Sequence, residues 1–161
     1  MNQYGTRAFQ KLLDYIVLDK DFDILKESFT NNIYQLILDQ NGNHVIQKIL
    51  SIFPKHKNQF IFDEIIKNIL EISKVQKGSI IISLAQSLAN EAQKYKLFSE
   101  IVKNVDKLIS DAYGNFIIQA VFVYKIDEFN KKIFNYVKSN IVQLSKDKFS
   151  SHVIDKVRLL F

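Results

Sequence analysis

Side chains that can hydrogen-bond to the edge of a nucleobase occur in this chain as pairs four residues apart. The clearest pairs are Asn43 with Gln47 and Asn115 with Gln119, and each pair directly follows a glycine. Asparagine and glutamine amides both donate and accept hydrogen bonds, so each can read a base edge. Residues four apart lie on one side of a helix. The pairs therefore predict a hydrogen-bonding surface rather than a site that makes or breaks bonds.

The pairs belong to three columns of residues that recur along the chain. The first column holds Thr6, Asn43, Ser79, Asn115 and Ser151. The second column, one residue later, holds Arg7, His44, Ile80, Phe116 and His152. The third column, four residues after the first, holds Gln10, Gln47, Ser83, Gln119 and Asp155. Arginine, histidine and phenylalanine are planar and can stack on bases, which contributes about 1–3 kcal/mol per base.

A fixed period positions these columns. The four glycines, Gly5, Gly42, Gly78 and Gly114, are spaced 37, 36 and 36 residues apart, and Ser150 lies a further 36 along. Repetition at a period of about 20–50 residues is typical of stacked repeat proteins. Ten residues before each glycine position after the first stands an asparagine that precedes an aliphatic residue: Asn32, Asn68, Asn104 and Asn140.

Apolar residues precede and follow each glycine position at helical spacing, so each unit is predicted to be a helix, a short turn and a second helix. The predicted pairs are 22–37 with 42–52, 57–73 with 78–88, 95–109 with 114–124, and 128–144 with 151 onward. The chain is predicted to open in a second helix at 5–17. This indicates an all-α solenoid. Asp39, Asp111 and Asp147, three residues before the glycine position, are predicted to cap helices, and Val75 interrupts that column.

Composition limits the possible function classes. A chain of 161 residues with 47% hydrophobic residues is long and apolar enough for one folded domain. The net charge of +5 favours an anionic partner. The absence of cysteine excludes disulfides and cysteine-based zinc sites. Apolar runs such as 80–82 are too short to cross a membrane. The three histidines, His44, His56 and His152, are separated by whole units, so we expect no metal, no cofactor and no enzymatic activity.

At these residues the chain resembles the Pumilio (PUF) repeat family, and Asn43, His44 and Gln47 match its Asn-His-x-x-Gln motif. The resemblance implies a right-handed α-solenoid of the armadillo type that binds single-stranded RNA with one base per repeat. It implies about three full and two partial repeats, at 1–31 (partial), 32–67, 68–103, 104–139 and 140–161 (partial). Because the chain ends in the apolar stretch Val157 to Phe161, we expect these repeats to be part of a longer array or to stack on another chain.

The resemblance also implies which base each repeat reads. Asn43/Gln47 and Asn115/Gln119 would read uracil, and Thr6/Gln10 would read adenine. Ser151/Asp155 would read guanine, although the family's usual acid at the second position is the longer glutamate. Ser79/Ser83 matches no strong code, and Ile80 is a poor stacking residue. Since RNA runs antiparallel to the family's protein chain, the expected site is 5′-GUNUA-3′.

The implied function is recognition of messenger RNA 3′ untranslated regions for translation repression or decay. It would take place in the cytoplasm, with the nucleus and nucleolus as alternatives, together with a protein effector and without a membrane or small-molecule substrate. The alternative is a helical scaffold that binds protein, or nucleic acid without sequence specificity, as in ribosome biogenesis. The Ser79 unit favours the scaffold. Recognition of RNA is favoured by the stacking residues that recur in register, Arg7, His44, Phe116 and His152.

Overall fold

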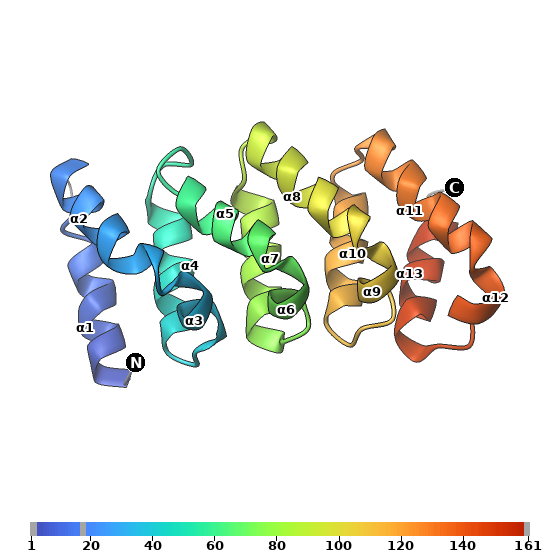
Figure 1. Cartoon of the computed structure of the whole chain (residues 1–161), viewed down its shortest axis with the longest axis horizontal. Helices are drawn as coiled ribbons and strands as arrows, with labels where there is room; N and C mark the ends of the chain where they lie inside the picture. Colours follow the sequence, from blue (N-terminus) through green and yellow to red (C-terminus); the bar gives the residue numbers. More distant parts are fainter. Residues whose placement is uncertain (1–2, 17–18, 160–161) are drawn as a thin grey trace.

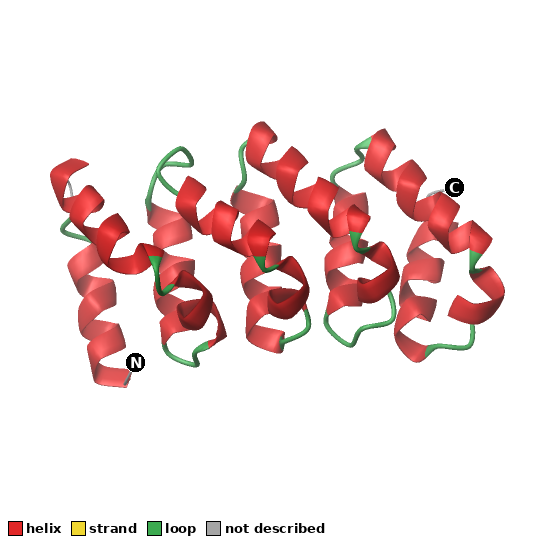
Figure 2. Ribbon diagram, viewed as in Figure 1, coloured by secondary structure: helices red, strands yellow, loops and turns green. Residues whose placement is uncertain are grey.

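The structure, a computed structural model, describes residues 3–16 and 19–159, and this part of the chain contains helices and loops without a strand (Figures 1 and 2). The helices are α1 (Gln3–Leu13), α2 (Asp19–Thr30), α3 (Ile33–Leu38), α4 (Gly42–Ile52), α5 (Gln59–Lys67), α6 (Ile69–Ser73), α7 (Gln76–Leu88), α8 (Glu91–Lys103), α9 (Val105–Leu108), α10 (Gly114–Val123), α11 (Asp127–Ser139), α12 (Ile141–Leu144) and α13 (Lys148–Arg158). The prediction of an all-α solenoid is confirmed. Leu160 and Phe161 lie outside the described residues.

The helices form a row of similar units (Figure 1). Helices α1, α4, α7, α10 and α13 lie side by side, each in contact with the next, and their N-terminal ends point to the same edge of the row. Helices α2, α5, α8 and α11 form a second layer, and the short helices α3, α6, α9 and α12 connect the two layers. The same part of each unit therefore faces the same side of the molecule.

The prediction of one continuous helix before each glycine position is wrong, because every such helix is split at the recurring asparagine. At Asn32, Asn68, Asn104 and Asn140 the backbone has φ from −120° to −105° and ψ from 0° to 30°, which interrupts the helical path. The asparagine carbonyl then accepts a hydrogen bond from the N–H four residues later, as Asn68 does from Ile72 at 3.0 Å. The asparagine column thus ends one helix and begins the next.

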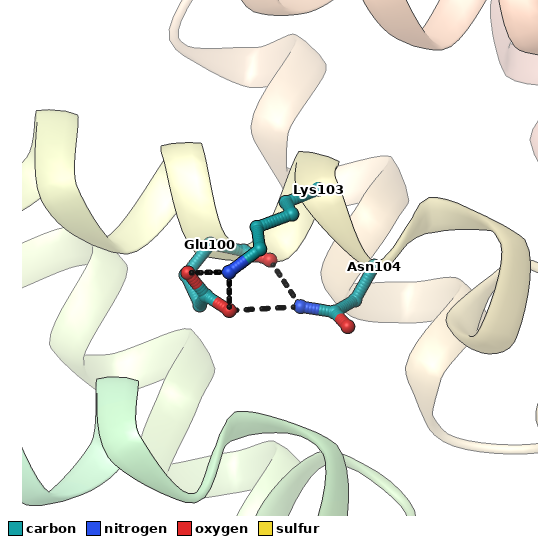
Figure 3. A network of polar contacts seen from close by, with 3 residues as sticks. All are labelled: Glu100, Lys103 and Asn104. Carbon is teal, nitrogen blue, oxygen red and sulfur yellow. Dashed lines mark hydrogen bonds and ion pairs between the residues drawn. The ribbon is translucent and has the colours of Figure 1, made fainter.

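The asparagine side chain compensates for the interruption. Its Nδ2 donates to the carbonyl oxygen four residues earlier, from Asn68 to Glu64 at 3.0 Å, from Asn104 to Glu100 at 2.9 Å and from Asn140 to Tyr136 at 2.8 Å. At Asn104 and Asn140 the backbone N–H donates instead to the carbonyls of Ile101 and Val137, so the side chain takes the place of the missing backbone donor. At Asn68 the side-chain bond adds to the backbone bond from Asn68 N–H to the Glu64 carbonyl at 3.2 Å. In α8 the Glu100 carboxylate also accepts from Asn104 at 3.1 Å and pairs with Lys103 at 3.2 Å (Figure 3).

The glycine column marks a close approach between the short helix and the second helix of a unit. A Cβ placed on Gly114 would lie 2.8 Å from the carbonyl oxygen of Leu108, well inside van der Waals contact. None of the glycines in the described part of the chain has a positive φ, so close packing explains their recurrence better than turn geometry does. Gly78 lies inside α7 rather than before it, so this glycine does not interrupt the helix as predicted.

The core runs without interruption through the row. Val45 and Ile46 are fully buried, and so are their counterparts Ile81 and Ile82 in the next unit. Polar side chains also connect neighbouring units. Gln93 Nε2 donates to the carbonyl of Lys55 at 2.9 Å and to Gln59 Oε1 at 3.2 Å. These contacts fix the relative positions of α5 and α8, which are adjacent helices of the second layer.

Candidate nucleic-acid interface

The three predicted columns lie on the second helices of the five units. The first column is mostly buried, with Thr6, Asn43, Ser79 and Asn115 buried and Ser151 half-buried. The second column is exposed at every position. The third column is half-buried at Gln10, Gln47 and Gln119 and exposed at Ser83 and Asp155. Since the second helices lie side by side, the structure brings the columns together as rows along one side of the solenoid.

Asn43 and Gln47 form a hydrogen-bonded pair. Gln47 Nε2 donates to Asn43 Oδ1 at 2.6 Å. Asn43, only 4% exposed, donates from Nδ2 to the carbonyl of Ile37 at 2.7 Å and to that of Lys77, in the next unit, at 3.1 Å. The asparagine amide is therefore held by its own unit and its neighbour, and Gln47 presents the more accessible amide of the pair.

Asn115 and Gln119 repeat this arrangement. Gln119 Nε2 donates to Asn115 Oδ1 at 3.0 Å, and Asn115 is fully buried. Its Nδ2 donates to the carbonyls of Asp111 at 2.8 Å and Ala112 at 3.0 Å. Both of these acceptors belong to the turn before α10, whereas one acceptor of Asn43 lies in the next unit. The two pairs still orient their glutamines in the same way, by donation to the asparagine oxygen.

The other three predicted pairs differ from the amide pairs. Ser151 Oγ donates to the carbonyl of Lys148 at 2.7 Å, within its own helix. Asp155 Oδ1 lies 3.7 Å from a guanidinium nitrogen of Arg158, and both side chains are largely exposed. Ser79 is buried, whereas Ser83 is exposed. Thr6 is buried beside the half-buried Gln10.

The predicted stacking column is exposed in every unit. Arg7, His44 and His152 are exposed, and Phe116 is exposed over 56% of its surface. A phenylalanine so exposed contributes little to the core, and its ring is available to an external planar group. Ile80, in the same register, is 48% exposed but has no planar face.

Aspartates position the first turns of these helices, as predicted. Asp147 Oδ1 accepts from the backbone N–H groups of Ser150 at 2.8 Å and Phe149 at 3.0 Å. The bond from Ser150 is the main cause that lowers the Asp147 pKa, and the opposing effect of burial is smaller. The N–H of Gly42 likewise lowers the Asp39 pKa. Asp111 accepts from Gly114 N–H at 2.8 Å. These carboxylates therefore fix the backbone immediately before the candidate site.

The three predicted columns do not include a further set of residues that lies on the same face of the second helices. Residues four after the second column are Lys11, Lys48, Leu84, Ala120 and Lys156. Lys48 Nζ lies 2.6 Å from Asp14 Oδ1, and this ion pair joins α4 to the residue that follows α1. The helical spacing from Arg7, His44 and His152 is a sequence signal that could have identified these lysines.

Within residues 3–16 and 19–159, no group of three or more histidine, cysteine, aspartate or glutamate side chains is arranged to hold a metal ion. None of the helices in this part of the chain has the length and apolar character needed to cross a lipid bilayer. The geometry therefore defines a class of protein, an α-solenoid of repeated units with hydrogen-bonding and planar side chains along one side.

Comparison with known proteins identifies the type of repeat. The family model for the Pumilio-family RNA binding repeat matches residues 1–25, 32–66 and 140–157. The chain is similar to putative pumilio homolog 8, chloroplastic, of Arabidopsis thaliana, with 39% identity over 67 residues, which is 42% of this chain and 13% of that protein. It is also similar to suppressor protein MPT5 of Saccharomyces cerevisiae, with 38% identity over 73 residues, which is 42% of this chain and 8% of that protein.

Solved structures extend the similarity over almost the whole chain. The Puf4 RNA binding domain bound to the HO endonuclease RNA 3′ UTR recognition sequence matches 96% of this chain at 33% identity and a TM-score of 0.89. The RNA-binding domain of yeast Puf5p bound to SMX2 RNA matches 97% at 35% identity and a TM-score of 0.87. This chain covers 49% and 46% of those two chains, about half of each. The chain therefore contains repeats of the Pumilio (PUF) type and is similar in fold to the Puf RNA-binding domains.

Proposed function

We propose that the chain binds single-stranded RNA along the row α1, α4, α7, α10 and α13, with one base placed at each unit. One observation carries the proposal. The pairs Asn43–Gln47 and Asn115–Gln119 hold the same hydrogen-bonded arrangement in two units, and each lies beside an exposed planar side chain, His44 or Phe116. Similarity to Puf domains bound to 3′ UTR recognition sequences supports it.

The glutamines suit uracil. One N–H of Gln47 is used by Asn43, which leaves its second N–H and Oε1 for a ligand. Uracil offers an N–H donor next to carbonyl acceptors, so it can pair with both groups at once. Asn43 is held in place by the carbonyls of Ile37 and Lys77, and in this proposal it orients the glutamine as well as lining the base edge. The same reasoning applies to Gln119 and Asn115.

The remaining units complete the site 5′-GUNUA-3′. Asp155, an exposed acceptor, would accept from the N–H groups of guanine, and Gln10 would contact adenine beside Thr6. The unit of Ser79, Ile80 and Ser83 combines a buried hydroxyl with an aliphatic side chain, and it accepts any base. On this basis the whole protein would recognise messenger RNA 3′ untranslated regions in the cytoplasm and regulate them through a protein effector.

Competition binding with singly substituted RNAs tests the assignment of bases to repeats. Each position of GUAUA is changed in turn, and every competitor is titrated against the same labelled strand. We expect losses of about tenfold at the two uracils, as for the loss of one or two hydrogen bonds, and almost none at the third position. Equal losses at all five positions, or none, would contradict the one-base-per-repeat reading.

A second candidate function follows from α7. The Ser79 unit lacks both a planar side chain and an amide pair, so an RNA strand would meet a gap in the middle of the row. This gap favours a scaffold that binds nucleic acid without sequence choice. In the competition experiment, such a scaffold would bind GUAUA and all its variants equally.

A further inference from the structure

The face that carries the stacking column extends beyond it along each second helix. Residues four and seven after a stacking residue lie on the same helical face. On α1 these residues are Lys11 and Asp14, on α4 Lys48 and Ser51, on α7 Leu84 and Ser87, on α10 Ala120 and Val123, and on α13 Lys156 and Leu159. The column that begins with Lys11 is therefore cationic in the first, second and fifth units and uncharged in the third and fourth.

The uncharged middle of this face is apolar as well. On α10, Phe116 is 56% exposed and Val123 is 65% exposed, with the half-buried Ala120 between them. On α7, Ile80 and Leu84 occupy the same register as Phe116 and Ala120, and Ser87 directs its hydroxyl to the carbonyl of Leu84 at 2.7 Å. Helices α7 and α10 are neighbours, so the two stripes adjoin.

The cationic part of the face contains an ion pair that would have to break before an RNA phosphate could bind its lysine. Lys48 Nζ lies 2.6 Å from Asp14 Oδ1, with side-chain exposures of 33% and 52%. A half-exposed ion pair is weak because water screens it. A phosphate oxygen that approaches α4 can therefore replace the Asp14 carboxylate as the partner of Lys48.

We propose that Lys11, Lys48 and Lys156 contact phosphates of the bound strand near its two ends, and that the strand crosses α7 and α10 without phosphate contacts. Over α7 and α10, bases and riboses lie on Ile80, Leu84, Phe116 and Val123. The proposal rests on the proposed RNA binding and adds the path of the sugar–phosphate backbone. Asp14 weakens binding in this scheme because it competes with a phosphate for Lys48.

The dependence of affinity on salt tests this path. Each phosphate contact on a single strand contributes about −0.7 to the slope of log K against log salt concentration. The slope is to be measured by fluorescence anisotropy for the 161-residue chain and a strand that contains GUAUA. The salt concentration is varied between 50 and 300 mM, which is about the range in which phosphate contacts respond to salt. Lys11→Ala and Lys156→Ala should each make the slope shallower by about 0.7. Lys96→Ala, at an exposed lysine of α8 in the other layer, is the matched control and should leave the slope unchanged.

Two further variants are expected to increase phosphate contact. Such an increase cannot be explained by a variant that merely fails to fold. Ala120→Lys places a cation on α10 in the register of Lys48 and Lys156, and it should steepen the slope by about 0.7 if a phosphate can reach it. Asp14→Asn frees Lys48 and should raise the affinity at low salt. A lysine that replaces Ala120 and leaves both affinity and slope unchanged would indicate that the backbone runs elsewhere.

The outcomes separate this inference from the proposed function. If the unaltered chain prefers GUAUA but Lys11→Ala, Lys156→Ala and Asp14→Asn leave the slope and affinity unchanged, the phosphate path is wrong and RNA recognition stands. If the unaltered chain shows no preference for GUAUA over a scrambled strand, sequence recognition fails. Slopes that respond to the lysines without such a preference would overturn the proposed function and leave only a basic binding face.

Discussion

The amide nitrogen of Gln47 lies 2.6 Å from the amide oxygen of Asn43, and in this position it can only donate to that oxygen. The asparagine in turn donates to two backbone carbonyls, those of Ile37 and Lys77. The orientation of the glutamine is therefore set by the backbone of two neighbouring units. A hydrogen-bonding surface that is fixed before the ligand arrives loses less entropy on binding, which favours selectivity.

Replacing this pair should change the preferred base. In the double variant Asn43→Ser with Gln47→Glu, a carboxylate that only accepts hydrogen bonds replaces an amide that donates and accepts. We expect preference at the fourth position of 5′-GUNUA-3′ to move from uracil to guanine, which offers adjacent N–H donors. Competition binding with the four bases at that position measures the shift. The same change at Asn115 and Gln119 should alter the second position instead, and an unchanged preference in both variants would count against the assignments.

The stacking column should show its effect most clearly at Phe116. Phe116→Ala removes an exposed ring and should weaken RNA binding by about 1–3 kcal/mol, as for one lost base–aromatic stack. Because the ring is 56% exposed, stability should change much less than after loss of a core phenylalanine. Ile80→Tyr supplies a ring in the same register of α7 and should strengthen binding. Titration of RNA and thermal unfolding of each variant check the two effects, and a Phe116→Ala protein with full affinity would argue against stacking there.

The glycines that lie against a short helix, Gly42, Gly78 and Gly114, should be intolerant of a methyl group. A Cβ on Gly78 would overlap the carbonyl of Ile72, with only 2.7 Å to its carbonyl carbon. Backbone has to move to relieve that contact, so Gly78→Ala should destabilise the protein by about 1–3 kcal/mol. Gly5 is exposed within α1, and there alanine should be neutral or stabilising. Urea unfolding of the two variants measures the contrast. Equal stabilities would show that close approach is not the reason for the column.

Acid should weaken the helix starts at the aspartates. The Ser150 N–H lowers the pKa of Asp147, and the Gly42 N–H lowers that of Asp39, below the ordinary value near 3.9. Since the folded state binds these protons less readily than the unfolded state, the carboxylates stabilise the fold at pH values above about 4. That contribution is lost as the pH falls through the folded pKa values. Urea unfolding between pH 7 and pH 3 should show Asp147→Asn to be less stable than the unaltered chain at neutral pH, with the difference shrinking below about pH 4. A difference that stays constant across this range would mean that the Asp147 charge does not contribute.

The repeat architecture could be predicted from the sequence because each unit repeats the same local signals. The glycine and asparagine columns keep one period, and the apolar residues between them, such as Val45 and Ile46, fall at the positions that the structure buries. The role of Asp39, Asp111 and Asp147 as acceptors for backbone N–H groups at the helix start was also predictable, since an aspartate in the turn before a helix accepts such groups whatever the tertiary context.

Two features could not be read from the sequence in the same way. The break at Asn104 falls within an apolar pattern that continues in register from Ile101 to Val105, so periodicity alone favours one helix there. The second feature is the burial of Asn43 and Asn115. The acceptors of Asn43 include the Lys77 carbonyl, which belongs to the next unit and is positioned only by packing between units.

The most direct test of the account compares two RNAs by fluorescence anisotropy. One carries GUAUA and the other the scrambled AUGAU, each within the same longer neutral strand at near-physiological salt. The account predicts that the chain prefers the first strand by about tenfold or more, since several bases each contribute contacts worth about 1 kcal/mol. Equal and weak binding to both strands that disappears as salt is raised would contradict it, and would identify a basic helical scaffold without sequence recognition.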